Sequence, residues 1–363
     1  MNYFFGFSHW KHEFIKPFFS SLDKNTIIFI NPIFKKNYFS LALKKGLNKN
    51  AIIYIWGKKE FPLVEKFAVE NEICIYRVED GFIRSIGLGS DLTQAYSIVI
   101  DSQGIYFDPT QKSDLETILQ TVKFKKKDLQ RAEEIAKYLI EKKLSKYNLY
   151  ENKKLELTTD KRVLLVPGQV EDDASIKYGA LGMTNLELLQ ETRKNSHDGY
   201  IVYKPHPDVL VGNRVGHIDE KLALKYADEI VTEIGLESVL EICDEVHTMT
   251  SLVGFEALMR NKKVFTYGMP FYAGWGLTQD TREEKRRKRR LNLNELIAGT
   301  LILYPSYISP FTLKFCEIET VMSELEEQKR VYNSSVIVRV KIRSRNFISR
   351  KLQFFLRILR INT

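Results

Sequence analysis

The sequence predicts an α/β fold with two Rossmann-like lobes and a central cleft, and three observations lead to this prediction. The chain has 363 residues, which is enough for two domains at roughly 150 residues each. Short β-branched runs alternate with helical patterns, and this alternation stops and restarts once. The polar stretch 153–161 separates the two series and is expected to be a linker. We therefore expect an N-terminal lobe over 1–152, a C-terminal lobe over 162–325 and a tail over 326–363.

The elements of the first lobe follow in order along the chain. Strands are expected at Thr26–Ile30, Ala51–Trp56 and Ile73–Val78, separated by helices at Phe39–Leu47 and Pro62–Glu70. A hairpin pairing Ser97–Ile100 with Gly104–Phe107 and a largely helical stretch over Ser113–Leu144 complete this lobe. Strand, helix and strand at this spacing indicate βαβ units and a parallel sheet.

The same pattern restarts after the linker. Strands are expected at Arg162–Val166, Tyr200–Tyr203, Glu245–Thr248 and Lys263–Tyr267, with helices at Met183–Lys194, Leu236–Cys243 and Ser251–Arg260. Ligands of such sheets bind at the carboxyl ends of the strands. The loops 79–81, 168–173 and 204–207 are therefore the expected ligand-binding segments.

The positive charge is concentrated in two short stretches. The net charge is +9, but 281–290 holds seven basic residues against two acids, and 331–363 holds eight basic residues and no acid. The remainder is mildly acidic, which argues against a nucleic-acid groove. We interpret the run 285–290 as a solvated loop or a contact with lipid phosphates.

Several classes of protein are excluded by simpler features. The sequence contains no run of about 18 apolar residues and no signal peptide, so we expect a cytoplasmic protein. Its three cysteines, Cys74, Cys243 and Cys316, are far apart and form no CxxC pair. They predict neither a disulfide framework nor a zinc site.

Two adjacent acids, Glu79 and Asp80, end a predicted strand close to Arg84. Carboxylates whose pKa values are separated by their surroundings suit a general acid or base. The alternative is a turn in which Asp80-Gly81 supplies the corner.

Three more acids, Glu171, Asp172 and Asp173, follow the first strand of the second lobe. Acids in this position could bind a metal, act as a base or attack an electrophilic carbon. The alternative is a solvated loop that caps the next helix.

Lys204 and His206 alternate with two prolines that restrict the backbone. They could bind a phosphate or protonate a leaving group. A structural histidine is the alternative.

Thr250 and Ser251 precede a predicted helix, where hydroxyls and free N–H groups form an anion site. Plain capping by Ser251 is the alternative and is compatible with the first role. Glu256, further along, could reach a ribose or be a surface acid. The loop 267–276, rich in glycine and aromatic residues, could approach a flat ligand or serve as a buried connector.

Taken together, five segments resemble the capsule polysaccharide β-Kdo transferase family of the KpsC type. They are EDGFIRSIGLGSDL (79–92), VPGQVEDDASI (166–176), VYKPHPDV (202–209), LESVLEICDEVHTMTSLVGFEAL (236–258) and KVFTYGMPFYAGWGLT (263–278). The resemblance implies a GT-B-like fold, CMP-Kdo as donor, and β-Kdo transfer with retention and without metal or other cofactor. It also implies an acceptor of the phosphatidylglycerol lipid type or a Kdo glycan, at the base of a capsule. Family members often carry two such modules, whereas this chain holds one.

The resemblance also implies roles for individual residues. Asp173 would be the nucleophile, with Asp172 beside it as the alternative, and Glu79 and Asp80 would deprotonate the acceptor hydroxyl or orient the acid/base. Similarity to bacterial sialyltransferases places His206 on the CMP phosphate. The further residues expected to bind the donor are Gln169, Lys204, Thr250, Ser251, Glu256, Tyr267 and Gly268, and those expected to bind the acceptor or a carboxylate are Arg84 and Ser85.

Two other functions remain open from the sequence. A related transferase could use another CMP-sugar, such as CMP-sialic acid. Alternatively, the chain could be a non-catalytic assembly protein at the membrane, because 347–361 forms a basic amphipathic pattern suited to an anionic leaflet. The same pattern predicts peripheral attachment of an enzyme to the inner membrane. No nucleic-acid partner is expected.

Overall fold

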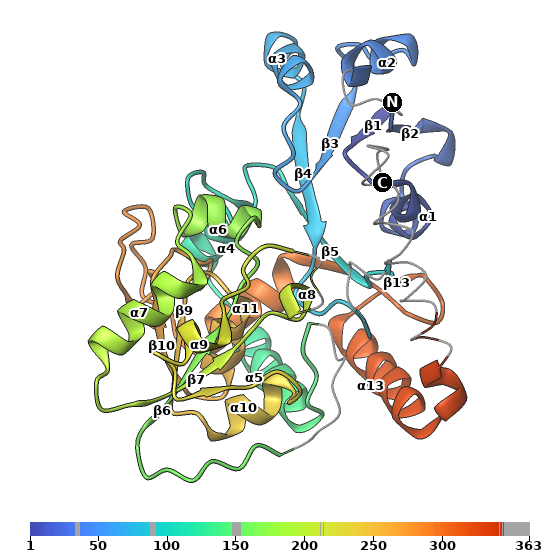
Figure 1. Ribbon diagram of the computed structural model, residues 1–363. Helices are drawn as coiled ribbons and strands as arrows, with labels where there is room; N and C mark the ends of the chain where they lie inside the picture. The colour runs from blue at the N-terminus through green and yellow to red at the C-terminus, as the bar shows by residue number, and fades with distance from the viewer. Residues whose placement is uncertain are drawn as a thin grey trace. The chain divides into compact units, whose positions relative to one another are not determined.

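The computed structural model describes residues 1–32, 37–87, 92–146, 154–210, 212, 214–340, 342 and 344 (Figure 1). These residues divide into two compact units. The first contains Met1–Ile105, Lys146 and the described residues from Tyr304 onward, and the second contains Tyr106–Ser145 and the described residues up to Leu303. Each unit is built on its own β-sheet, so the α/β architecture with two sheets predicted from the sequence is confirmed.

The sheet of the first unit has seven strands in the order β13-β12-β5-β4-β3-β1-β2. The bounds of these strands are β1 Asn2–Phe5, β2 Ile27–Ile30, β3 Ile52–Trp56, β4 Ile75–Asp80, β5 Ser97–Asp101, β12 Pro305–Ile308 and β13 Phe315–Cys316. Strands β1 to β4 pair in parallel, but β5, β12 and β13 add antiparallel pairs. The parallel pairing expected for β2, β3 and β4 is present, and the antiparallel strands β12 and β13 were not predicted. The described residues between β4 and β5 form no crossover helix, which a parallel connection would need.

The strand β1 was not predicted, although it lies between β3 and β2 within the sheet. Tyr3, Phe4 and Phe5 are fully buried, and the Phe4 ring stacks on Tyr54 with 4.7 Å between centroids. A parallel strand buried on both faces shows no alternation of polar and apolar residues. The aromatic start of the chain therefore lacked the usual strand pattern.

The predicted hairpin over 97–107 is also wrong. Ser97–Asp101 forms β5 as expected, but no strand forms at 104–107. The Asp101 carboxylate instead accepts hydrogen bonds from the backbone N–H groups of Gln103 and Gly104, at 3.0 and 2.8 Å, and so ends the strand in a side-chain-capped turn.

The second unit has a six-stranded sheet in the order β11-β10-β9-β6-β7-β8, and every pair in it is parallel. Its strands are β6 Val163–Pro167, β7 Tyr200–Lys204, β8 Glu229–Ile230, β9 Glu245–Thr248, β10 Lys263–Thr266 and β11 Gln279–Asp280. The four strands expected here are confirmed to within a residue. They are fully buried along β6 and β9, as parallel strands covered on both faces are.

The helices expected from the sequence are present close to their predicted positions, with the stretch 113–144 divided into α4 and α5, whereas α1, α6, α8, α9, α12 and α13 were not predicted. In the first unit they are α1 His12–Ile15, α2 Tyr38–Lys44, α3 Pro62–Glu70 and α13 Ile318–Ser334. In the second unit they are α4 Asp114–Thr121, α5 Lys126–Glu141, α6 Ala174–Gly179, α7 Asn185–Asn195, α8 Pro207–Leu210, α9 Glu220–Ala223, α10 Leu236–Ile242, α11 Leu252–Met259 and α12 Leu293–Ile297. Among the described residues, no helix has both the length and the apolar character needed to cross a bilayer.

Two segments belong to a different sheet or unit from the one that chain order suggested. Residues 305–308, within the range expected for the C-terminal lobe, form β12 and pair with β5 of the first sheet. Helices α4 and α5, within the range expected for the N-terminal lobe, belong to the second unit. Such exchanges depend on long-range pairing and leave no mark on local sequence patterns.

Candidate functional site

In the first unit, Glu79 and Asp80 are the last two residues of β4, at the carboxyl end of the parallel strands. Backbone hydrogen bonding aligns this end with that of β3, because the N–H of Gly57 donates to the Val78 carbonyl at 2.8 Å. Gly57 has a φ of +57°, and a Cβ there would stand 2.8 Å from Glu79 Oε2. A glycine is thus needed both for the backbone turn and for the space that the Glu79 carboxylate occupies.

Arg84 holds Asp80 in place. Its Nε donates to Asp80 Oδ2 at 2.7 Å, its Nη1 to Ser85 Oγ at 2.8 Å and its Nη2 to the Thr93 carbonyl at 2.7 Å. Ser85 Oγ in turn donates to the Gly87 carbonyl at 3.0 Å. Arg84 and Ser85 are fully buried. The two residues expected to bind an acceptor are therefore engaged with protein groups, and Arg84 orients Asp80.

The two carboxylates differ in proton affinity. Burial, reinforced by the negative charge of Asp80, raises the pKa of Glu79. Burial would also raise the pKa of Asp80, but the positive charges of Arg84, Lys11 and Lys146 outweigh it and lower that pKa to about 2. When two neighbouring carboxyl groups have different pKa values, one can carry a proton while the other stays anionic.

Lys11 is a member of this site that sequence reasoning missed. It ends a 3-10 turn, His9–Lys11, and its ammonium lies 3.1 Å from the centre of the Trp56 ring. Burial lowers the pKa of Lys11 to about 8, against the opposing effects of Asp80 and Glu79. The only available signal was one lysine within a strongly aromatic segment. Such a lysine could equally be an exposed surface residue.

In the second unit, the loop after β6 carries the predicted acids, and Asn185 fixes its shape. Asn185 Oδ1 accepts from the backbone N–H of Gln169 at 2.8 Å, and its Nδ2 donates to the Gln169 and Gly216 carbonyls at 2.8 and 2.9 Å. The backbone N–H of Asn185 donates to Glu171 Oε1 at 2.7 Å. No role was predicted for Asn185, although it lies near the start of an expected helix, where asparagine often bonds to a loop.

The neighbouring aspartates have different partners. Asp173 caps α6, and its Oδ1 accepts from the backbone N–H and the hydroxyl of Ser175 at 2.9 and 2.8 Å. The capping alternative is therefore realised at Asp173. Its Oδ2 accepts no hydrogen bond from any described residue. Asp172 is exposed and pairs with Arg214 at 3.0 Å.

The start of α11, expected to bind an anion, is occupied by a side chain of the protein. Gln169 Oε1 accepts from the backbone N–H groups of Thr250 and Ser251 at 2.9 and 3.1 Å and from Thr248 Oγ1 at 3.3 Å. Gln169 Nε2 donates to Thr250 Oγ1 at 3.0 Å. Ser251 Oγ accepts from the Val253 N–H at 3.2 Å, so Ser251 is also the helix cap. The structure thus brings together three of the residues expected to bind the donor.

Lys204 and His206 lie beside this loop. The Gly168 N–H donates to the Lys204 carbonyl at 2.8 Å, and Pro167 and Lys204 are register partners at the ends of β6 and β7. Lys204 Nζ donates to the Ile234 carbonyl at 2.5 Å, and burial lowers its pKa to about 8. His206 Nδ1 accepts from the Asp208 N–H at 3.1 Å at the start of α8.

The last three expected donor-binding residues lie among buried groups. Glu256 on α11 is buried, so the reading as a surface acid is wrong. The Tyr267 hydroxyl lies 3.1 Å from His247 Nδ1. Gly268 packs so closely that a Cβ would stand 2.7 Å from the Gly179 carbonyl oxygen. Most of the loop 267–276 is buried, which supports the connector alternative.

Comparison with known proteins now identifies the family. The model of the capsule polysaccharide biosynthesis protein family matches residues 51–307. This chain belongs to that family. It is 47% identical over 334 residues to the capsule polysaccharide modification protein LipA of Neisseria meningitidis serogroup B, a match that covers 92% of this chain and 46% of LipA. The chain thus spans about half the length of the LipA relatives that it matches.

Two solved structures resemble this member of the capsule biosynthesis family. The Thermosulfurimonas dismutans KpsC β-Kdo 2,7 transferase is 39% identical with a TM-score of 0.73, and covers 90% of this chain and 99% of its own. The β-Kdo 2,4 transferase of KpsC from the same organism is 29% identical with a TM-score of 0.74, and covers 89% and 97%. The chain is therefore similar in fold and sequence to these two Kdo transferases.

Part of the basic run 285–290 of this family member, expected to be a solvated loop or a contact with lipid phosphates, is bonded to other groups of the protein. Arg286 Nε donates to Glu116 Oε1 at 2.7 Å, and Arg287 Nη1 donates to the Pro270 and Ala273 carbonyls at 2.6 and 2.7 Å. Arg289 Nη1 donates to the Val122 carbonyl at 2.6 Å. These arginines fasten the run to α4 and to the loop 267–276. Lys285, Lys288 and Arg290 remain exposed.

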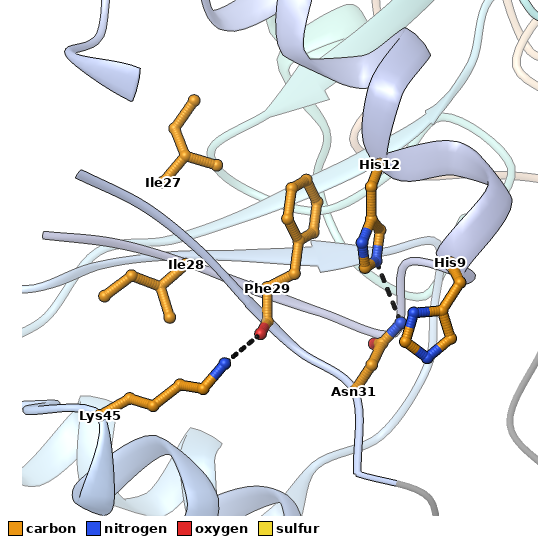
Figure 2. Close-up of a pocket in the computed structure, with 7 residues that line it drawn as sticks. All are labelled: His9, His12, Ile27, Ile28, Phe29, Asn31 and Lys45. Carbon is orange, nitrogen blue, oxygen red and sulfur yellow. Dashed lines mark hydrogen bonds between the residues drawn. The ribbon is translucent and has the colours of Figure 1, made fainter. Parts of the chain in front are cut away.

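A separate cavity of about 620 Å³ opens in the first unit, beside the edge strand β2 (Figure 2). Its lining residues are His9, His12, Ile27, Ile28, Phe29, Asn31 and Lys45. Figure 2 shows the His12 ring against Phe29, with 3.8 Å between centroids, and Lys45 Nζ donating to the Phe29 carbonyl at 3.2 Å. None of these residues was expected to be functional. The described residues contain no cluster of three or more metal-ligating side chains.

Proposed function

We propose that the protein is a retaining β-Kdo glycosyltransferase that uses CMP-Kdo in capsule polysaccharide biosynthesis. The observation that carries this proposal is the similarity to the KpsC β-Kdo 2,7 transferase, which covers nearly all of that chain at 39% identity. The higher identity to this module than to the 2,4 transferase favours a 2,7 linkage. The acceptor would be a Kdo glycan or a phosphatidylglycerol-type lipid.

Transfer with retention can proceed as two inversions at one carbon, through a covalent intermediate on a carboxylate. In the first, a carboxylate oxygen of Asp173 would attack the anomeric carbon of Kdo as its bond to the CMP phosphate breaks. The two contacts from Ser175 hold Oδ1 and leave Oδ2 without a described protein donor, which suits attack through Oδ2. Asp172, exposed and paired with Arg214, is the alternative nucleophile.

In the second inversion, an acceptor hydroxyl attacks the same carbon, the bond to Asp173 breaks, and the hydroxyl proton must be removed. Glu79 is the better base of the pair in the first unit, because its raised pKa lies closer to neutrality than that of Asp80. Asp80, held anionic by Arg84, would accept a hydrogen bond from the acceptor and orient it.

The leaving CMP phosphate gains negative charge as the bond breaks. Lys204 and His206 at the end of β7 are assigned to this phosphate, with Thr250 and Ser251 at the start of α11. In the structure, Gln169 Oε1 accepts hydrogen bonds from the backbone N–H groups of Thr250 and Ser251. We therefore assign Gln169 the role of keeping these donors aligned until the phosphate binds. Glu256, Tyr267 and Gly268 would border the nucleoside.

The proposed reaction needs neither metal nor other cofactor, and its site is proposed to work at the inner membrane. The predicted amphipathic segment 347–361 lies outside the described residues. Immediately before it, the described end of the chain carries exposed Val336, Ile337 and Val340. Exposed apolar side chains next to a basic segment favour peripheral contact with an anionic leaflet.

The test is intact-mass measurement after mixing the protein with CMP-Kdo without acceptor. We expect an adduct of one Kdo that is absent in Asp173→Asn and retained in Asp198→Asn, an exposed control acid paired with Arg162. Addition of EDTA should not change the adduct. No adduct and no transfer from CMP-Kdo, with turnover of CMP-sialic acid instead, would replace the proposed donor. Turnover of neither would support a non-catalytic assembly role.

A further inference from the structure

Lys11 lies within the corner of the first unit that contains Glu79 and Asp80. Its ammonium rests 3.1 Å from the centre of the Trp56 ring, and Trp56 is the last residue of β3. The next residue is Gly57, where an added Cβ would stand 2.8 Å from Glu79 Oε2. Lys11 therefore lies close to Glu79, because Trp56 is the register partner of Val78, the residue before Glu79.

The ammonium of Lys11 has no hydrogen-bond acceptor among the described residues, although the side chain is only 9% exposed. A buried cation without acceptors is unfavourable unless other charges or aromatic faces compensate for it. Trp56 supplies an aromatic face, with Trp10 further away at 5.4 Å. Packing alone would favour an apolar side chain here, so a lysine points to a role for its charge.

One oxygen of the Asp80 carboxylate likewise has no hydrogen-bond partner among the described residues. Its Oδ2 is held by Arg84, whereas its Oδ1 is buried and accepts no hydrogen bond from a described residue. The corner thus holds an unpaired ammonium and an unpaired carboxylate oxygen near each other. The charged groups that act on Glu79 or Lys11 here come from several elements and are Lys11, Lys59, Asp80, Glu79, Arg84 and Lys146.

We propose that Lys11 is a positioning residue for Glu79 and Asp80, and that its ammonium, held against Trp56, sets how readily Glu79 gives up its proton. This inference rests on the acid/base role proposed for Glu79. A positive charge near a carboxyl favours its ionised form, so Lys11 counteracts the effect of burial on Glu79. Lys11 thereby keeps Glu79 ionised, and able to act as a base, at a lower pH than burial alone would allow.

The experiment compares Lys11→Met, which removes the charge, with Lys11→Arg, which keeps it. Lys66→Met is the matched control, because Lys66 is an exposed lysine of the same unit that forms a surface ion pair with Glu70. Glu79 is titrated directly by NMR in protein carrying carboxyl-¹³C glutamate, and its signal is assigned by loss in Glu79→Gln. The pH dependence of kcat/KM with CMP-Kdo is measured in parallel.

We expect Lys11→Met to raise the midpoint of the Glu79 titration by about one pH unit, the lower end of the effect of a close opposite charge. The acid limb of kcat/KM should move upward equally. Lys11→Arg and Lys66→Met should titrate like the unaltered protein. The melting temperature of Lys11→Met should be unchanged or higher, because removing a buried charge relieves a desolvation penalty.

An unchanged Glu79 midpoint in Lys11→Met would overturn the inference. So would unfolding of both Lys11→Met and Lys11→Gln, because Lys11 would then be a structural residue. The two proposals fail separately. If the unaltered protein transfers no Kdo but the NMR shift is present, the proposed function is wrong and the effect of Lys11 on Glu79 stands.

Discussion

The side-chain oxygen Oε1 of Gln169 lies 2.9 Å from the backbone nitrogen of Thr250 and accepts its N–H. The same oxygen accepts the Ser251 N–H, so it takes the place that an anion would take at the start of α11. These two N–H groups immediately before α11 thus donate to a neutral amide from a loop about eighty residues earlier in the chain. The amide is a weaker partner for these groups than a phosphate would be.

Substitutions at Gln169 should separate stability from donor binding. Gln169→Ala removes the acceptor of the Thr250 N–H and leaves the Ser251 N–H with Thr248 Oγ1, and should lower the free energy of unfolding by about 1–2 kcal/mol. Gln169→Glu puts a fixed negative charge there, which suits the helix end but repels CMP-Kdo. We expect near-normal stability and a KM for CMP-Kdo raised at least about tenfold, a loss of about 1.4 kcal/mol in binding. Urea unfolding and initial-rate kinetics measure the two effects, and an unchanged KM in Gln169→Glu would remove this helix end from the donor site.

Variants of Asp173 can distinguish its cap from its proposed chemistry. Asn and Ser are good caps, so Asp173→Asn and Asp173→Ser should stay within about 0.5 kcal/mol of the unaltered protein in stability. Asp173→Ala loses the bonds to Ser175 and should cost about 1 kcal/mol. All three should abolish the Kdo adduct, because none supplies a carboxylate. If Asp173→Ser still forms the adduct, Asp172 is the nucleophile.

Local patterns were sufficient for elements whose stability is local. The helix at Pro62–Glu70 was predicted to the residue, since proline opens it and its apolar spacing is regular. The strands β6 and β7 were equally clear as short apolar runs between turns. By contrast β1 shows no alternation, because both of its faces are buried, and β12 is defined by its antiparallel pairing with β5, about two hundred residues earlier.

The candidate site also contains some residues that local sequence patterns could reveal and others that only the fold reveals. The acids at strand ends could be found, because the carboxyl ends of parallel strands are where ligands bind. Lys11 could not, since only the fold brings it to Trp56. The partners of Arg84 could not be predicted for the same reason: they become visible only once Asp80, Ser85 and Thr93 surround it.

The inward-facing arginines of the run 285–290 give a third prediction. The Arg287 guanidinium is almost fully buried, pairs with Glu116 at 3.3 Å and donates to the Pro270 and Ala273 carbonyls. Arg287→Ala leaves a buried carboxylate and two carbonyls without this partner and should destabilise the protein by about 3–5 kcal/mol. Lys285→Ala, an exposed neighbour with the same loss of charge, should change stability by less than about 0.5 kcal/mol. Urea unfolding measures both. Equal stability of the two variants would restore the reading of this run as a solvated loop.

The opposite pKa shifts of Glu79 and Asp80 give stability effects of opposite sign. Burial raises the pKa of Glu79, so its ionisation destabilises the folded state as pH rises above the ordinary glutamate pKa of about 4.3. Glu79→Gln should therefore melt higher than the unaltered protein at pH 7 and nearly equally at pH 4.

The pKa of Asp80 is lowered to about 2, so its charge stabilises the fold above about pH 4, and this stability is lost as pH falls through 2. Asp80→Asn should accordingly melt lower at pH 7. Differential scanning calorimetry at both pH values measures these differences in melting temperature. Lys11, with its pKa of about 8, is still charged at pH 7. Shifts of the same sign in both variants would show that the two carboxylates do not divide the charge as the structure indicates.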